Sequence, residues 1–146
     1  MSHYFILLVL HLFAAIFFVG TVFFEVLMLE GIRDRLGHET MRTVELNVAW
    51  RARRIMPFVI LTLFGAGIGM AWTYRDALAQ PFASTFATLL WIKIALALSV
   101  LGHFLTAMTL SGTGKLKSRH FRIIHISVFC HVVAIVFIAK AMFYAA

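Results

Sequence analysis

The stretch FRIIHISVFCHVVAIVFIAKAMFY, residues 121–144, is long and apolar enough to cross a membrane as one helix. A helix rises about 1.5 Å per residue, so roughly 20 apolar residues span a hydrocarbon core of about 30 Å. The same rule predicts three further spans, at about residues 4–29, 55–72 and 86–110. The chain is therefore expected to be all-α: an integral membrane four-helix bundle that forms a single four-span domain over residues 1–146.

The composition excludes several classes of protein. The chain is 62% hydrophobic and only 13% charged, unlike an ordinary soluble domain. Its single cysteine, Cys130, excludes an intramolecular disulfide and argues against iron–sulfur and zinc–thiolate centres, which need several thiolates. No Walker motif, HExxH motif or nucleophile elbow is present, so hydrolytic chemistry has no support. The net charge of +7 bears on membrane orientation, and we expect no nucleic-acid partner.

The basic residues indicate how the chain is oriented in a membrane. The first connection, residues 30–54, contains six arginines, and the third, residues 111–120, contains three basic residues. The second connection, residues 73–85, has only Arg75. Lys and Arg collect in cytoplasmic loops, so the first and third connections are expected to face the cytoplasm. Both termini would then lie in the periplasm, for a multi-pass protein of the bacterial inner membrane.

The first connection is predicted to be helical. Met41, Val44 and Val48 recur at helical spacing. Gly37 can end one helix, and Thr40 can cap the next. The first two helices are therefore expected to extend past the membrane into the cytoplasm.

Four histidines, His11, His103, His125 and His131, lie inside the apolar spans. An ionisable residue within a membrane is by default a candidate functional site. Depth estimated from the helical rise allows His11 to pair with His131 and His103 with His125, and it also allows His103 to pair with His131. Imidazoles on facing helices of a four-helix bundle can hold haem iron, so all four are candidate cofactor and metal ligands. Hydrogen-bonded packing is the alternative for each.

Three other features of the spans invite a functional hypothesis. Lys93 is estimated to lie near the level of His11, where it either binds a propionate of a porphyrin held by His11 or extends to the interface. Glu25 either pairs with a nearby arginine, which is the favoured hypothesis, or relays protons. Gly65 and Gly69 form a small-xxx-small face that permits close helix approach, within the bundle or in a homodimer.

Copper is the alternative to haem. Methionine thioethers are soft ligands that suit Cu(I). No two of the candidate methionines stand three or four residues apart, and methionine commonly fills gaps in cores. They are Met28, Met56, Met70, Met108 and Met142.

Three groups of residues carry a family resemblance. They are His11-Leu12-Phe13 with Phe18-Val19-Gly20, the run from Pro57 to Leu63, and Trp91-Ile92-Lys93 with His103-Phe104. In these the chain resembles the superfamily of small four-helix bacterial membrane proteins that includes the HemJ-type haem-binding protoporphyrinogen oxidases and the CopD copper-resistance domains. The resemblance implies a haem contact at His11 and carries over Lys93 and His103. His125 and His131 have no counterpart in those oxidases and fit a b-type cytochrome with ligands of its own.

The sequence thus predicts a membrane redox protein that binds one or two b-type haems. Its function would be electron transfer, or the oxidation of a lipophilic partner such as a quinol or a porphyrinogen. Whether it is an enzyme stays open; if it is, the expected class is oxidoreductase. The alternatives are a HemJ-type protoporphyrinogen oxidase, a CopD-type copper-binding or transport protein, and a structural subunit whose histidines only pack.

Overall fold

Four long helical rods make up the computed structural model, which describes residues 3–144. The rods run over His3–Leu36, His38–Ala79, Thr85–Gly112 and Ser118–Tyr144, and each is long and apolar enough to cross a membrane. Within this described range the chain has no strand. The predicted all-α architecture with four spans is therefore confirmed.

The rods are built from the following elements. They are α1 (His3–Phe23), the π-helical segment η1 (Phe24–Leu29), the 3₁₀ turn η2 (Glu30–Ile32), α2 (Arg33–Leu36), α3 (His38–Ala71), the 3₁₀ turn η3 (Trp72–Tyr74), α4 (Arg75–Ala79), α5 (Thr85–Gly112) and α6 (Ser118–Tyr144). Only Gly37 separates α2 from α3, and its φ of 74° lies in the left-handed region that glycine adopts without strain. The first connection, residues 30–54, is thus almost entirely helical, and the first two helices extend beyond the apolar stretches as predicted.

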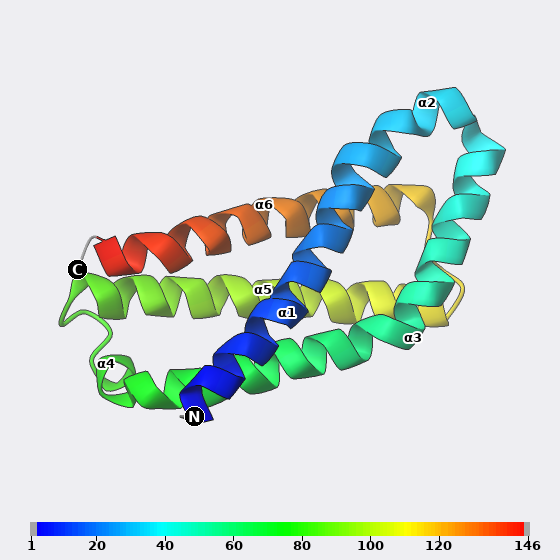
Figure 1. The fold of residues 1–146 in the computed structure, drawn as a ribbon. Helices are drawn as coiled ribbons and strands as arrows, with labels where there is room; N and C mark the ends of the chain where they lie inside the picture. The colour runs from blue at the N-terminus through cyan, green and yellow to red at the C-terminus, as the bar shows by residue number, and fades with distance from the viewer. Residues whose placement is uncertain (1–2, 145–146) are drawn as a thin grey trace.

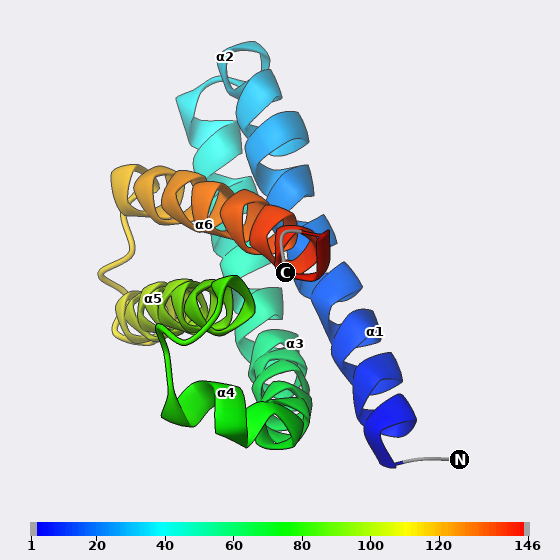
Figure 2. The ribbon, with the colours of Figure 1, turned by 90° about the vertical axis from the view of Figure 1, so that its left-hand side faces the viewer.

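The rods associate as two antiparallel hairpins. The first rod packs chiefly on α3, and α5 packs chiefly on α6. The two pairs cross at an angle, and α2 projects beyond the end of the α5–α6 pair (Figures 1 and 2). Both termini lie at one end of the molecule, and α2 and the α5–α6 connection lie at the other, which we call the α2 end (Figure 1). Pro57 lies inside α3, where its ring removes one backbone hydrogen bond and favours a bend.

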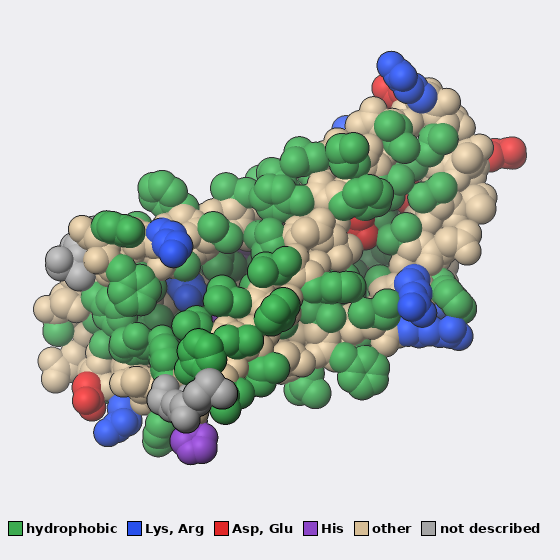
Figure 3. Space-filling view, in the orientation of Figure 1, with side chains coloured by type: hydrophobic (Ala, Val, Ile, Leu, Met, Phe, Trp, Pro, Cys, Tyr) green, Lys and Arg blue, Asp and Glu red, His purple; other side chains and the backbone are tan. Residues whose placement is uncertain are grey.

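The shared core is small, and large apolar side chains cover the outside. Each of the four rods contributes to one buried cluster of Phe18, Val22, Met56, Ile60, Val100, Val128 and Val132. Phe13, Phe58, Leu61 and Phe137 are each at least 70% exposed. Apolar side chains cover most of the middle of the face in Figure 3, and most charged side chains lie toward its ends. A surface of this kind is stable against lipid and costly in water.

Candidate functional site

Two serines and two histidines close a ring of hydrogen bonds between α5 and α6. On each helix the histidine Nδ1 lies 2.8 Å from the backbone carbonyl oxygen of the serine four residues earlier, His103 to Ser99 and His131 to Ser127. The Nε2 atoms reach across: His103 lies 2.9 Å from the Ser127 Oγ, and His131 lies 3.1 Å from the Ser99 Oγ. The two imidazole centroids are 5.3 Å apart. Each helix therefore binds the histidine of the other.

The carbonyl partners decide the protonation of this Ser–His ring. A carbonyl oxygen only accepts, so each Nδ1 carries the hydrogen and donates it. In the neutral imidazole each Nε2 then accepts the hydrogen of the opposite serine hydroxyl, and both ring nitrogens of each histidine are satisfied. The ring is thus complete without an added ligand, as expected for buried polar groups in a membrane.

Glu25 and His125 form a second polar site, between the first rod and α6. The Glu25 side chain is 5% exposed, and its Oε2 contacts the His125 Nε2. The His125 Nδ1 donates to the Phe121 carbonyl oxygen at 2.7 Å, and the Phe121 ring lies against the imidazole with centroids 4.2 Å apart. Glu25 belongs to η1, and such π-helical segments occur frequently at functional sites.

Glu25 Oε2 and His125 Nε2 are in ion-pair contact, although the Oε2 accepts no well-aligned hydrogen bond among residues 3–144. The His125 Nδ1 already donates to a carbonyl, so in the neutral imidazole Nε2 has only a lone pair. A bare Nε2 against a bare carboxylate would place two acceptors in contact. The pair is therefore either imidazolium with carboxylate or imidazole with carboxylic acid. A second proton would give imidazolium with carboxylic acid, in which the Nε2–H still meets a carboxyl oxygen, so the pair can gain one positive charge without losing its contact.

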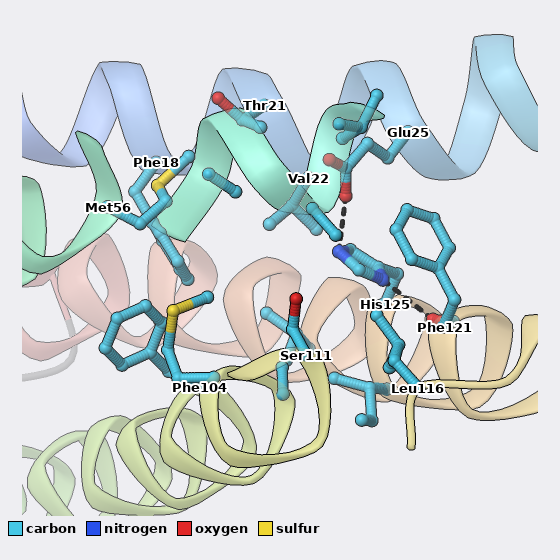
Figure 4. A pocket seen from close by; sticks show the side chains of 17 residues that line it. Phe18, Thr21, Val22, Glu25, Met56, Phe104, Ser111, Leu116, Phe121 and His125 are labelled. Atoms are coloured by element: carbon cyan, nitrogen blue, oxygen red, sulfur yellow. Dashed lines mark hydrogen bonds and ion pairs between the residues drawn. The ribbon is translucent and has the colours of Figure 1, made fainter. Parts of the chain in front are cut away.

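A cavity of about 70 Å³ adjoins this pair. All four rods line it, mostly with apolar side chains, and Glu25 and His125 stand on its wall (Figure 4). Ser111 and Thr21 add two hydroxyl groups to the lining. The Thr21 hydroxyl already donates to the Phe17 carbonyl oxygen at 2.8 Å. The cavity thus joins an apolar space to a proton-binding pair.

His11 and Lys93 lie away from the other histidines. The His11 Nδ1 donates to the Leu63 carbonyl oxygen at 2.8 Å, and its ring rests on Gly67, where an added Cβ would come within 3.3 Å. Lys93 is half-buried and within electrostatic range of His11, so the depth estimate for these two residues agrees with the structure. Neither residue reaches the Ser–His ring through a contact among residues 3–144.

The glycine face differs from the prediction. Gly67 and Gly69 face α1, and a Cβ on Gly69 would lie 2.8 Å from the end of the Leu7 side chain. Gly65 has no atom near its Cβ position and is exposed. The small face that admits α1 is therefore offset by two residues from the predicted Gly65, because α1 crosses α3 at an angle.

A charge network closes the α2 end of the bundle. Glu45 is fully buried, and it accepts a hydrogen bond from Arg33 Nη2 at 2.7 Å and one from the Ser118 hydroxyl. Arg42 lies 3.5 Å from the same carboxylate. Arg33 also binds Glu30 through two hydrogen bonds of 2.7 and 2.8 Å. The network ties α2, α3 and α6 together.

Arg122 adds a second ion pair to Glu30, at 2.9 Å. The hydrogen bonds from Arg33, with its charge and that of Arg122, hold the pKa of Glu30 below its usual range. Glu30 is therefore charged at neutral pH and serves as a fixed partner. The arginines favoured as partners of Glu25 are thus used by Glu30 and Glu45, and the prediction of a Glu25–arginine pair is corrected to Glu25–His125.

The histidine pairs can now be compared with the expectation. The structure brings His103 and His131 together, the arrangement that the depth estimate also allowed. It brings together neither His11 with His131 nor His103 with His125, because His11 binds α3 and His125 binds Glu25. Depth estimates take no account of the crossing of the two hairpins or of the direction in which each imidazole points.

The described packing does not fit a haem or a resident metal ion. When two imidazoles bind one metal ion from opposite sides, each ligating nitrogen lies about 2 Å from the ion. In a haem protein the porphyrin plane would also have to fit between the two rings. His103 and His131 leave no such gap, and each Nε2 is occupied by a serine. The 70 Å³ cavity is far below the roughly 300–1,000 Å³ of usual ligand sites. Residues 3–144 contain no group of three His, Cys, Asp or Glu placed to hold a metal ion.

Two features escaped the sequence analysis. The motif Ser-Val-x-x-His occurs twice, at residues 99–103 and 127–131, and the shared spacing signals the reciprocal Ser–His ring. The Glu25–His125 contact has a weaker signal, which is two ionisable residues at a similar estimated depth near the α2 end. No family model matches the sequence, and neither a curated protein nor a solved structure is similar to it.

Proposed function

We propose that this multi-pass protein binds and transfers protons within the bacterial inner membrane, at the Glu25–His125 pair. The observation that carries the proposal is a buried carboxylate in contact with an imidazole on the wall of an intramembrane cavity. Ionisable residues inside membrane spans mark proton relays and transport pathways. The cycle would alternate between the pair with one shared proton and the pair with two, imidazolium with carboxylic acid, so each turn binds one proton and releases one.

The surroundings of the pair support this assignment. Glu30 and Arg122 line a small pocket together with Glu25 and His125, and Glu30 and Glu45 are held by arginines. The carboxylates of Glu30 and Glu45 thus have guanidinium partners, whereas Glu25 faces an imidazole. The π-helical turn at Glu25 also loosens the regular hydrogen bonding of the first rod at the place where a side chain would have to adjust.

Orientation is part of the same proposal. Arg51, Arg53 and Arg54 lie on α3 near the α2 end, Lys115 and Lys117 lie in the α5–α6 connection, and Arg119 lies in the first turn of α6. The positive-inside rule then places the α2 end in the cytoplasm and both termini in the periplasm. Alkaline phosphatase fused at residue 144 should be active and a fusion at residue 114 inactive. The reverse pattern would overturn the orientation.

Infrared spectroscopy of the reconstituted protein tests the proton site. A pH titration should reveal a carboxylic acid band that disappears in Glu25→Gln and shifts in His125→Gln. Glu39→Gln is the matched control, because Glu39 is exposed on α3. Proteoliposomes of the wild type should also carry more proton current than those of Glu25→Gln. A titration that is unchanged in Glu25→Gln would show that the pair is a static contact.

A haem-binding redox protein is the second candidate, and one observation favours it: His103 and His131 converge from facing helices. Binding would require α5 and α6 to separate and both serines to release the imidazoles. An optical spectrum of the purified protein, oxidised and reduced, tests this directly. A sharp reduced α-band that is lost in His131→Ala would support haem. A colourless protein with stoichiometric copper would support the copper alternative.

A further inference from the structure

The cavity beside Glu25 and His125 has the size of a single aromatic ring. One water occupies roughly 10–15 Å³ on this scale, so a volume of about 70 Å³ holds roughly five to seven non-hydrogen atoms. A hydroxybenzene has seven. A tetrapyrrole is several times larger, so the porphyrinogen expected from the resemblance does not fit this space.

The lining favours a ring over a cluster of waters. A buried water typically makes about three hydrogen bonds, and the cavity offers few partners beyond the Glu25–His125 pair and Ser111. Most of the wall is apolar, including Phe18, Met56, Phe104, Met108 and Phe121. Aromatic rings and thioethers make favourable contacts with another aromatic ring. Figure 4 shows Phe18, Met56 and Phe104 around the space and Glu25 with His125 at one end.

The polar end matches one hydroxyl group. A phenolic hydroxyl can donate, and in either protonation form of the pair the Glu25 carboxyl keeps an oxygen that can accept it. The His125 ring is held on both sides, by its Nδ1 bond to the Phe121 carbonyl oxygen and by the Phe121 ring itself. The hydroxyl would therefore meet a preoriented partner, which reduces the entropic cost of binding.

We propose that this cavity binds a hydroxylated aromatic ring, with the ring among the apolar side chains and the hydroxyl group on Glu25 and His125. The assignment rests on the proposed proton site and names the chemical class of its partner. The ring is that of a small phenol, because the head group of a membrane quinol has two hydroxyls and further substituents and so has more non-hydrogen atoms than the cavity holds. Because all four rods line the cavity, an occupant would also tie the two hairpins together.

Binding of phenol and of methoxybenzene to the protein in nanodiscs tests the proposal, with saturation-transfer NMR as the readout. Methoxybenzene keeps the ring and lacks the donor hydrogen. Phenol should bind at least tenfold more tightly to the wild type, and Glu25→Gln should reduce this preference. Equal binding of the two probes would overturn the assignment.

Cavity-filling variants locate the site. Ala107→Phe on α5 and Ala52→Leu on α3 should each abolish phenol binding, because both alanines line the cavity. Ala95→Phe is the matched control, since Ala95 is exposed on α5 and lies outside the lining. Phenol binding that persists in both filled variants would overturn the proposal. Two filling variants on different helices guard against the loss of folding in one.

Competition tests the size limit, and the carboxyl titration separates the two proposals. Decylubiquinol should not displace phenol, because its head group exceeds the cavity volume, and displacement would overturn the assignment to a small phenol. If the Glu25 carboxyl band titrates but phenol does not bind, the ring assignment fails and the proton site stands. If phenol binds and the band does not titrate, the proton-transfer function fails.

Discussion

Glu25 and Glu45 are both buried glutamates near the α2 end, and their partners differ. Glu45 is held by Arg33 and Arg42, whose guanidinium groups stay charged at any pH at which the protein is folded. Glu25 meets His125, the residue type whose ordinary pKa lies closest to neutral pH. The partners of Glu45 therefore keep their charge, whereas the proposed function lets the charge of the Glu25–His125 pair change. Both glutamates are buried, so the difference in their expected roles comes from the side chain that each of them contacts.

The largest loss of stability is expected at Glu45, because the charges of its arginine partners cannot be neutralised. Glu45→Leu should lower the free energy of unfolding by about 3–5 kcal/mol, because it leaves Arg33 and Arg42 without their buried partner. Denaturation in a graded detergent mixture would measure it. Glu39→Leu, at an exposed position on α3, is the control. A loss below about 1 kcal/mol at Glu45 would remove the distinction between the two glutamates.

Glu25→Leu is expected to have a smaller effect, about 1–3 kcal/mol, because His125 can become neutral and leaves only one unsatisfied nitrogen. The double variant Glu25→Leu/His125→Leu should recover much of this loss, since it removes both polar partners together. The same denaturation assay measures both. A double variant less stable than either single variant would indicate a further partner of the pair.

The Ser–His ring should contribute less again. Ser99→Ala and Ser127→Ala should each cost about 0.6 kcal/mol and at most about 1.7 kcal/mol, the range measured for hydrogen bonds between membrane helices. Neither variant should move the carboxyl band of Glu25. Double-mutant cycles that combine each serine variant with His131→Ala or His103→Ala would show which hydrogen bonds of the ring are energetically coupled. Loss of the band in Ser127→Ala would mean that the ring and the pair form one proton network.

The smallest expected effect is a pH dependence of the folded protein's stability that arises from Glu30. Its pKa is lowered in the folded protein by Arg33 and Arg122, so the stabilisation is fully present above its ordinary value of about 4.5. It is lost as the pH falls from there through the lowered folded pKa, because protonation neutralises the carboxylate. Thermal unfolding of the wild type should decline in this acidic range, and the decline should be weaker in Glu30→Gln. An equal decline in both would assign it to other carboxyl groups.

The number and length of the spans were predictable because hydropathy and helical rise depend on local sequence alone. The helical character of residues 38–54 was predictable for the same reason, from Met41, Val44 and Val48. Partner choice was not predictable, because it depends on helix rotation and on the crossing of the hairpins. Thus His131 meets His103 and not His11, although their estimated depths allowed both pairs.

Glu25 shows a second limit. The rule that a membrane carboxylate seeks an arginine is sound, but it does not say which carboxylate each arginine takes. Glu30 and Glu45 lie closer along the chain to Arg33 and Arg42, and they take them. The π-helical segment at residues 24–29 turns Glu25 away from the register of a regular helix, and no residue pattern in the sequence marks it.

The reciprocal bonding of the Ser–His ring has a consequence for directionality. Because α5 and α6 are antiparallel and each offers the same motif to the other, exchanging the two helices leaves the bonding pattern unchanged. Viewed along the membrane normal, the ring looks alike from either face, so by itself it cannot distinguish one compartment from the other. Among residues 3–144 the Glu25–His125 pair has no such counterpart toward the termini, and the proposed movement of protons through the bundle would derive its direction from that asymmetry.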